Sequence, residues 1–335
     1  MRPRIAIIYN EPLPCRYQST GEQAAVLGVL EEVEAVYKAL NELGYPVSRT
    51  PLLPPLDQVR ETLARLEADL VFNLFEGFDG RPETEAAVAY QLSELGLRYT
   101  GCSGAALSLA LDKGKTKALL QAAGLNTPRY QILDGDSLAE FDLNYPCIVK
   151  PYAEDASHGI SEMSVVSAFP SLERQTIWVS SLYGGKALVE EFIEGREFNT
   201  TVLGDGSLTV LPISEIAYAL PPGAPRILTY AAKWEPRSTY YEATIAVCPA
   251  EIESQLWEQI ESAATLAFNT LGCAGYARVD FRLDAGERLH IIEVNPNPDI
   301  SPTSGAARQA QAAGMSYRDF IERIVLIALQ RFAWR

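Results

Sequence analysis

The sequence has few histidines and cysteines, and this limits the chemistry that it supports. Its 335 residues include 2 histidines, His158 and His290, which excludes a histidine-rich metal site. The 5 cysteines are odd in number and scattered, with no C-x-x-C pair. We therefore expect free thiols and a cytoplasmic protein rather than a framework of disulfides.

Positive charge and long apolar runs are also scarce. The chain has 28 Lys and Arg residues against 43 Asp and Glu residues, a net charge of −15. This disfavours nucleic-acid and anionic-membrane partners, because both need a basic face, although a local cluster of cations can still bind an anionic ligand. No apolar run has the length of a membrane span or of a signal peptide. Hydrophobic residues make up 47% of the chain, enough for a packed core, and the length favours two or three domains.

Strands and helices alternate in the first hundred residues. The apolar run 5–10 predicts a buried strand, and apolar residues at three-and-four spacing over 23–43 predict an amphipathic helix. The same reading predicts strands in 45–52 and 69–75 and helices over 55–67 and 83–95. Such alternation is typical of a parallel sheet with helices on its faces.

The remainder of the chain is richer in strands. A helix is predicted over 104–123, a strand at 146–150, a loop of small residues at 152–161, a helix near 170–182 and a strand at 187–193. Strands dominate from residue 194 onward, with helices at about 251–271 and 315–334. The segment 226–244 has little periodicity, and long irregular segments of this kind often form lids.

The stretch 276–299 predicts a β-hairpin, because two alternating runs flank Asp284–Glu287. With Ala285-Gly286 as a two-residue turn, Arg278 lies opposite Glu293 and Asp280 lies opposite Ile291; a three-residue loop would change this register. In the two-residue register one face carries Arg278, Asp280, Glu293 and Asn295, and the other carries Val279, Phe281, Ile292 and Val294.

Three oxygen-bearing side chains beside an arginine favour a site for Mg²⁺, which prefers hard oxygen ligands. The alternative is a surface ion pair between Arg278 and Glu293. Lysines at 113, 150 and 233 supply the cations that the phosphates of a nucleotide need, although each one alone is also typical of a solvated surface.

The ordered set of these segments resembles the ATP-grasp superfamily, in its D-alanine–D-alanine ligase branch. The matching segments are DK (112–113), PCIVKP (146–151), the loop 153–161, VEEFIEGREF (189–198), Lys233, ARVDF (277–281) and EVNPNP (293–298). The resemblance extends over about residues 5–330 and implies an α/β (α+β) ATP-grasp fold in three parts. These are an N-terminal Rossmann-like preATP-grasp domain with a parallel sheet (1–101), a central ATP-grasp subdomain (102–187) and a C-terminal ATP-grasp catalytic subdomain (188–335).

The resemblance also implies which residues bind the nucleotide and metal. The phosphates of ATP are assigned to Lys113, Lys150, Lys233 and the loop that contains Ser157 and His158. The adenine is assigned to Glu190 and to backbone groups of Glu191, Phe192 and Ile193, and the ribose to Glu197. Two Mg²⁺ ions, or Mn²⁺ in their place, are assigned to Asp280, Glu293 and Asn295.

The implied reaction is ATP-dependent ligation of a carboxylate to an amine through an acyl phosphate. Its catalytic residues are Lys233, Arg278, which stabilises the developing charge, Asp299, whose backbone N–H serves as an oxyanion donor, and Ser304, which grips the acceptor carboxylate. The expected substrates are small molecules, amino acids or peptides, and a homodimer is one option. Three alternatives stay open: a true D-alanine–D-alanine ligase, a non-catalytic ATP-binding relative, and an enzyme that releases or passes on the acyl phosphate.

Departures from the family pattern predict different substrates. The family's N-terminal Gly-Gly-x-Ser-x-Glu stretch has no clear match in 9–26, where Glu22 lies near, its lid Lys-Tyr is Lys233-Trp234, and its first loop serine is Ala156. Asp299 replaces a glycine and should favour a cationic acceptor over an anionic one. Whether Glu22, Glu76, Glu83 or Trp234 contacts the substrate is left open.

Overall fold

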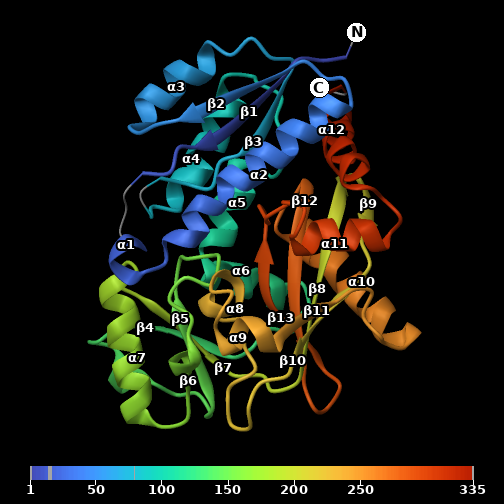
Figure 1. Cartoon of the computed structure of the whole chain (residues 1–335). Coiled ribbons are helices and arrows are strands. Elements are labelled where there is room, and N and C mark those ends of the chain that lie inside the picture. The colour runs from blue at the N-terminus through green and yellow to red at the C-terminus, as the bar shows by residue number, and fades with distance from the viewer. Residues whose placement is uncertain (1, 14–16, 79, 334–335) are drawn as a thin grey trace.

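The computed structural model describes residues 2–13, 17–78 and 80–333, and it contains three sheets (Figure 1). The first sheet is parallel, with the order β2 (Val47–Leu52), β1 (Ile5–Asn10), β3 (Leu70–Leu74). Its helices are α1 (Tyr17–Thr20), α2 (Gln23–Glu42), α3 (Leu56–Ala64) and α4 (Glu83–Glu94). The parallel sheet predicted from the alternation of strands and helices is confirmed.

The second sheet is antiparallel and lies in the middle of the chain. Its order is β4 (Tyr130–Leu133), β7 (Ala187–Glu191), β5 (Cys147–Pro151), β6 (Val165–Val166), and α7 (Phe169–Leu182) packs on it. Short 3-10 turns, η1 (Leu138–Glu140) and η2 (Glu162–Ser164), connect the strands. Because β7 pairs with both β4 and β5, we propose that the central domain extends to Glu191, beyond the predicted boundary at 187.

The third sheet contains the C-terminal strands, all antiparallel. Its order is β11 (Thr244–Val247), β10 (Ser214–Tyr218), β8 (Arg196–Asp205), β12 (Gly275–Leu283), β13 (Leu289–Asn295), and β9 (Ser207–Val210) pairs with β8. The helix α10 (Ser254–Thr270) packs against β8, β9, β12 and β13. The predicted lid contains two short helices, α8 (Tyr230–Trp234) and α9 (Thr239–Ala243).

The helix predicted over 104–123 is two helices, α5 (Gly104–Leu111) and α6 (Lys113–Ala122). The break falls at Asp112, whose side chain accepts a hydrogen bond from the Lys115 N–H at 3.0 Å and so caps α6. Asp before a helical segment is a common N-cap, because its carboxylate satisfies an N–H that has no partner within the helix. The cap places Lys113 at the first position of α6.

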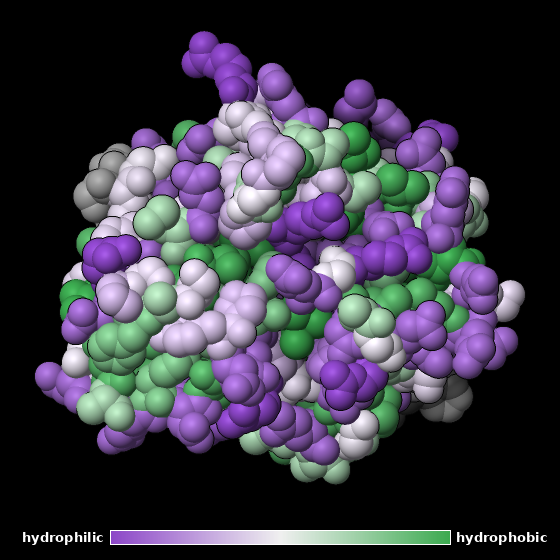
Figure 2. All heavy atoms as spheres, turned by 90° about the horizontal axis from the view of Figure 1, so that it is seen from below, coloured by the Kyte–Doolittle hydropathy of each residue, from purple (hydrophilic) through white to green (hydrophobic). Residues whose placement is uncertain are grey.

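The last helix, α12 (Tyr317–Ala333), returns to the first domain, so both ends of the chain lie at the same end of the molecule (Figure 1). Its Phe320, Ile321 and Ile324 belong to one buried core with Ile5 and Val33. No helix within the described residues is long and apolar enough to cross a membrane. On the face shown in Figure 2, polar and apolar side chains form small alternating patches.

The hairpin of β12 and β13 differs from the predicted register. Its loop has three residues: the Asp284 N–H donates to the Arg288 carbonyl at 3.0 Å. A bulge then shifts the pairing by one residue, so that Asp280 lies opposite Glu293 and Arg278 opposite Asn295. The predicted pairs Arg278–Glu293 and Asp280–Ile291 are therefore wrong, and Ile291 rather than Ile292 belongs to the core. The bulge still leaves all four polar side chains on one face, as predicted, because directly opposite residues share a face.

Candidate active site

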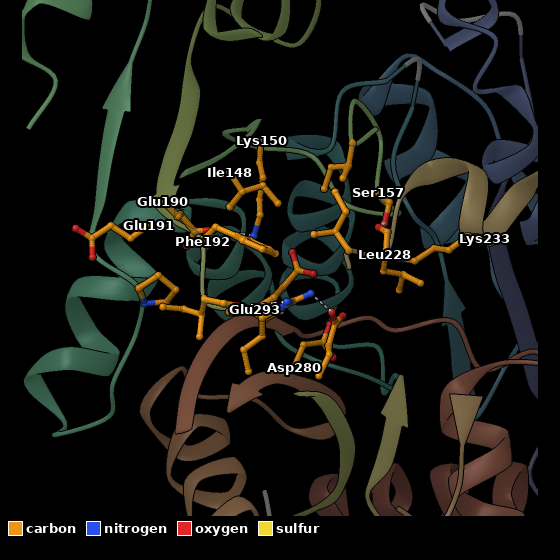
Figure 3. A pocket seen from close by; sticks show the side chains of 17 residues that line it. Ile148, Lys150, Ser157, Glu190, Glu191, Phe192, Leu228, Lys233, Asp280 and Glu293 are labelled. Carbon is orange, nitrogen blue, oxygen red and sulfur yellow. Dashed lines mark hydrogen bonds and ion pairs between the residues drawn. The ribbon is translucent and has the colours of Figure 1, made fainter. Parts of the chain in front are cut away.

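A cavity lies between the central and C-terminal sheets. Figure 3 shows Glu190 to Phe192 on one side, Ser157 and Lys233 on the other, and Asp280 with Glu293 below. The predicted site residues that line it are Lys150, Ser157, Glu190, Glu191, Phe192, Ile193, Glu197, Lys233, Asp280 and Glu293. Tertiary packing thus brings together predicted site residues that are up to 143 positions apart in the sequence, from Lys150 to Glu293.

Apolar side chains line much of the cavity, and a cavity of this kind suits a flat base. Its apolar walls come from Pro128, Ile148, Ile160, Phe192, Ile193, Ile227, Leu228 and Ile292. The N–H groups of Glu191 and Phe192 donate to the carbonyls of Arg129 and Pro146, each at 2.9 Å. These two donors are used within the protein, so the Ile193 N–H is the group of the predicted set that we propose for an adenine edge.

Glu190 lies at the back of the cavity between two lysines. Its side chain is 1% exposed, Lys150 Nζ lies 2.7 Å from Oε2, and Lys117 Nζ pairs with Oε1. Burial alone would raise the pKa of Glu190, but the two lysines outweigh burial and lower that pKa to about 2. The carboxylate is held by two cations and lines the cavity, and its contact with the adenine amine stays a prediction.

Lys117 is a site residue that the sequence reasoning missed. Its side chain is 5% exposed, and burial lowers its pKa more than Glu190 raises it. A signal was present, because Lys113 and Lys117 stand four residues apart and therefore share one face of α6.

One face of the β12–β13 hairpin carries Asp280, Glu293 and Asn295, the residues predicted to bind metal. Cationic side chains pair with both carboxylates of this face. Arg278 donates two hydrogen bonds to Asp280, at 2.6 and 2.7 Å, so it does not form the surface pair with Glu293 that was the alternative reading. Lys113 Nζ lies 2.9 Å from Glu293 and 3.2 Å from Asp155. Burial raises the pKa of Glu293, but Lys113 outweighs it and lowers that pKa to about 2.

The donor set of this face fits a hard divalent cation. The described residues hold no group of three or more His, Cys, Asp or Glu side chains suited to a metal, so the set rests on two carboxylates and one amide. Asp280 and Glu293 face each other across the two strands, and the Asn295 amide oxygen accepts a bond from the Asn297 N–H at 2.9 Å. Oxygen donors of this kind suit Mg²⁺, which keeps several of its positions for water and phosphate.

Two hydrogen bonds join the loop of residues 153–161, predicted to cover the phosphates and called the phosphate loop below, to the predicted lid, residues 226–244. Ser157 Oγ donates to the Leu228 carbonyl at 3.0 Å, and Trp234 Nε1 donates to the Ala156 carbonyl at 3.2 Å. The Trp234 ring also packs against Gly28 of α2, where an added Cβ would lie 3.2 Å from it. Trp234 therefore packs the lid, and Lys233 beside it lines the cavity.

His158 points away from the cavity and toward the first domain. Its Nδ1 lies 3.0 Å from Glu22 Oε2, its ring stacks on Tyr17 at 3.9 Å, and its side chain is buried. Glu22 also accepts bonds from the Gly159 N–H at 2.9 Å and the Tyr183 hydroxyl at 2.8 Å. This placement does not favour the predicted contact of His158 with a phosphate. It assigns Glu22, which the sequence left open, to anchoring the phosphate loop.

The two remaining predicted residues lie after β13 and outside the cavity lining. Ser304 caps α11 (Gly305–Ala312), where its Oγ accepts from the Ala307 N–H at 3.1 Å. Asp299 is exposed, and its carboxylate accepts from the Ser301 N–H at 2.7 Å and the Ser301 hydroxyl at 3.1 Å.

Comparison with known proteins identifies the family. The model described as D-ala D-ala ligase C-terminus matches residues 119–326. This chain belongs to the D-alanine–D-alanine ligase family. The D-alanine–D-alanine ligase of Gluconobacter oxydans is 34% identical over 300 residues, which cover 89% of this chain and 93% of that relative. An uncharacterized protein, y4sG of Sinorhizobium fredii, is 32% identical over 309 residues, with 89% of this chain and 88% of that relative covered.

Solved structures of this family share the fold. The D-alanine–D-alanine ligase from Bacillus anthracis complexed with ATP has a TM-score of 0.74 and 23% identity, over 98% of both chains. The VanG D-Ala:D-Ser ligase from Enterococcus faecalis has a TM-score of 0.75 and 19% identity, over 98% of this chain and 100% of that chain. The predicted ATP-grasp fold is confirmed. The chain is a ligase of the D-alanine–D-alanine ligase family that forms carbon–nitrogen bonds, and family membership implies small amino-acid substrates, ATP and a divalent metal.

Proposed function

We propose that this ligase joins a carboxylate to an amine through an acyl phosphate and that its two substrates are not both D-alanine. The observation that carries the proposal is a contrast between the two halves of the site. The nucleotide side holds Lys150, Lys233, Asp280 and Glu293 around one cavity. The substrate side has Trp234 packed into the lid and Asp299 in the segment that follows β13.

The second candidate is D-alanine–D-alanine ligation itself. It is favoured by the activity for which the relatives are named, such as the D-alanine–D-alanine ligase of Carboxydothermus hydrogenoformans, 30% identical over 308 residues. The two candidates share the nucleotide chemistry and differ in the amino-acid pockets.

In our proposal the protein's cations hold the nucleotide in place. Lys150 and Lys233 bind phosphate oxygens, and Asp280, Glu293 and Asn295 hold two Mg²⁺ ions, or Mn²⁺. A bound divalent cation supplies neutralisation of the phosphate charge. Burial alone would lower the pKa of Arg278, but the carboxylate of Asp280 outweighs burial and raises that pKa, so the guanidinium stays charged and stabilises negative charge at the reacting carbonyl. The joined lid and loop exclude water from the acyl phosphate.

The test is ATP-dependent phosphate release with a panel of amino acids, followed by mass spectrometry of the products. We expect release with an amino-acid pair other than two D-alanines, and no release from the Asp280→Asn variant. Rapid release with D-alanine alone, yielding the D-alanyl-D-alanine product, would overturn the proposed difference in substrate and support the second candidate.

Three further properties stay predictions of this proposal. The protein is predicted to be cytoplasmic, a homodimer is one option for its assembly, and the chain is predicted to divide into three domains. The four cysteines that the structure describes, Cys102, Cys147, Cys248 and Cys273, are free thiols, as the cytoplasmic prediction requires.

A further inference from the structure

Arg282 is a buried arginine in the wall of the cavity that holds the predicted nucleotide residues. It is 4% exposed and lies on β12, two positions after Asp280. Because alternate residues of a strand share a face, Arg282 lies on the same face as Asp280, and both residues line the cavity (Figure 3). On the neighbouring strand β8 the residue directly opposite Arg282 is Glu197. Strand pairing therefore places a cation beside the carboxylate that is predicted to bind the ribose.

The guanidinium of Arg282 joins three parts of the cavity. Its Nη1 donates to the carbonyl of Ile193, the residue whose N–H is proposed for the adenine edge, at 3.1 Å. Its Nη2 donates to Glu197 Oε2 and to the carbonyl of Arg226, the first residue of the predicted lid. The guanidinium carbon also lies over the Phe192 ring, 5.0 Å from the ring centroid. A guanidinium can meet several acceptors at once because its N–H donors form a planar fork, whereas an ammonium acts as a point charge.

These contacts leave one oxygen of Glu197 available to a ligand. Its Oε2 accepts hydrogen bonds from Arg282 and from the Tyr218 hydroxyl, the latter at 2.7 Å. Its Oε1 accepts no hydrogen bond from the residues that the structure describes, although the side chain is 9% exposed and lines the cavity. Buried polar atoms normally have a partner. The Oε1 atom therefore suits a donor that a bound molecule supplies, such as a hydroxyl group.

The pairing with Arg282 also balances the charge of Glu197. A lone carboxylate in this cavity would repel the phosphates of ATP. Arg282 and Glu197 form a buried ion pair, as Lys113 and Glu293 do. The carboxylate can thus accept a hydrogen bond from a nucleotide without adding net negative charge to the cavity.

We propose that Arg282 is a positioning residue for the ribose of ATP. Together with Tyr218 it holds Oε2 of Glu197, so that Oε1 is presented to a ribose hydroxyl. The inference rests on the proposed ligase function and on the predicted contact of Glu197 with the ribose. It adds the group that orients this carboxylate, and it links the ribose to the lid, because the same guanidinium holds the Arg226 carbonyl.

The test compares the binding of ATP, 2′-deoxy-ATP and 3′-deoxy-ATP to the full chain, by calorimetry with Mg²⁺ and without amino acids. We expect ATP to bind ~10-fold more tightly than at least one of the deoxy nucleotides, the size of one hydrogen bond to a charged group. The Arg282→Lys variant keeps the charge but loses the planar fork, so it should lose most of that preference. Its affinity for the deoxy nucleotide should change little, whereas a general loss of structure would weaken the binding of every nucleotide.

The Arg288→Lys variant is the control, because Arg288 lies in the same hairpin but is largely exposed, and it should keep the preference. Equal binding of the nucleotides by the wild-type chain would overturn the inference, as would an undiminished preference in Arg282→Lys. If Arg282→Lys does not fold, the Tyr218→Phe variant decides. It removes the other donor to Oε2 and should reduce the preference ~3-fold, and an unchanged preference in it would also overturn the inference.

The same titrations separate this inference from the proposed function. Absence of ATP binding by the wild-type chain would overturn the proposed function itself. Binding of ATP without a preference for the ribose hydroxyls would overturn the role of Arg282 alone.

Discussion

At the scale of single residues, the site depends on charges that are buried in compensating pairs. Glu190 sits between Lys117 and Lys150, and Lys113 sits between Glu293 and Asp155. A buried ion pair gains little over an apolar pair, but removing one partner leaves an uncompensated charge. We infer that Glu190 keeps two lysines charged and oriented at the back of the nucleotide cavity.

The Glu190→Gln substitution tests this arrangement. It keeps the shape of the side chain and leaves two buried lysines without a counter-charge, so we expect the free energy of unfolding to fall by about 3–5 kcal/mol. Urea denaturation at neutral pH measures the change. The Lys115→Gln variant is the control, because Lys115 lies on α6, the helix that carries Lys117, but is largely exposed. Equal free energies of unfolding for Glu190→Gln and the wild type would show that Glu190, Lys117 and Lys150 are not charged as proposed.

At the scale of elements, two loops are positioned by contacts with the first domain. Glu22, immediately before α2, accepts bonds from His158 and Gly159 of the phosphate loop, and Trp234 of the lid packs on Gly28 of α2. The start of α2 therefore positions both coverings of the nucleotide cavity.

The Glu22→Ala substitution should release the phosphate loop. It removes the four hydrogen bonds of a buried carboxylate, and we expect the KM for ATP to rise ~3- to 10-fold with a loss of about 1–3 kcal/mol in the free energy of unfolding. Hydrogen exchange of residues 153–160 reports the loop directly. The Glu31→Ala variant, changed at an exposed position of the same helix, is the control. Unchanged exchange in Glu22→Ala would show that other contacts hold the loop.

At the scale of the whole molecule, the carboxylates divide into two groups with opposite responses to pH. Glu190 and Glu293 have lowered pKa values, so their contribution to stability is present above pH 4.5 and is lost as the pH falls toward 2. Glu32, Glu76 and Glu85 have raised pKa values, and their protonated forms favour the folded state. Their contribution is present below pH 4.5 and is lost as the pH rises.

The pH dependence of the ligand-free protein follows from Glu76. Its folded pKa of about 8 exceeds the unfolded value of 4.5, so stability should decline between pH 4.5 and 8. In the Glu76→Gln variant this decline should be smaller by about 1 kcal/mol, a modest value because water reaches the side chain. Urea denaturation at pH 5 and pH 8 measures both proteins. Parallel declines in the two proteins would contradict the raised pKa of Glu76.

The sequence specified what depends on near neighbours. Periodic apolar residues predicted β1, α2 and the parallel first sheet, and alternation placed Arg278, Asp280, Glu293 and Asn295 on one face. The N-cap signal of Asp112 was also present in the sequence, although the helix was predicted as continuous. Such features follow from residue spacing because backbone periodicity is local.

Tertiary structure alone decided which distant groups meet. Glu22 and His158 are 136 positions apart, and Ile300 and Glu32 are 268 positions apart. The bulge that sets Asp280 opposite Glu293 likewise depends on how the two strands pair, not on either strand alone. Local spacing carries no information on these contacts, because the packing of the three sheets and their helices sets the distances. The nucleotide chemistry could therefore be predicted from ordered residue types, whereas the contacts of Glu22 and Glu32 became visible when α2, the loop of residues 153–161 and the segment after β13 were brought together.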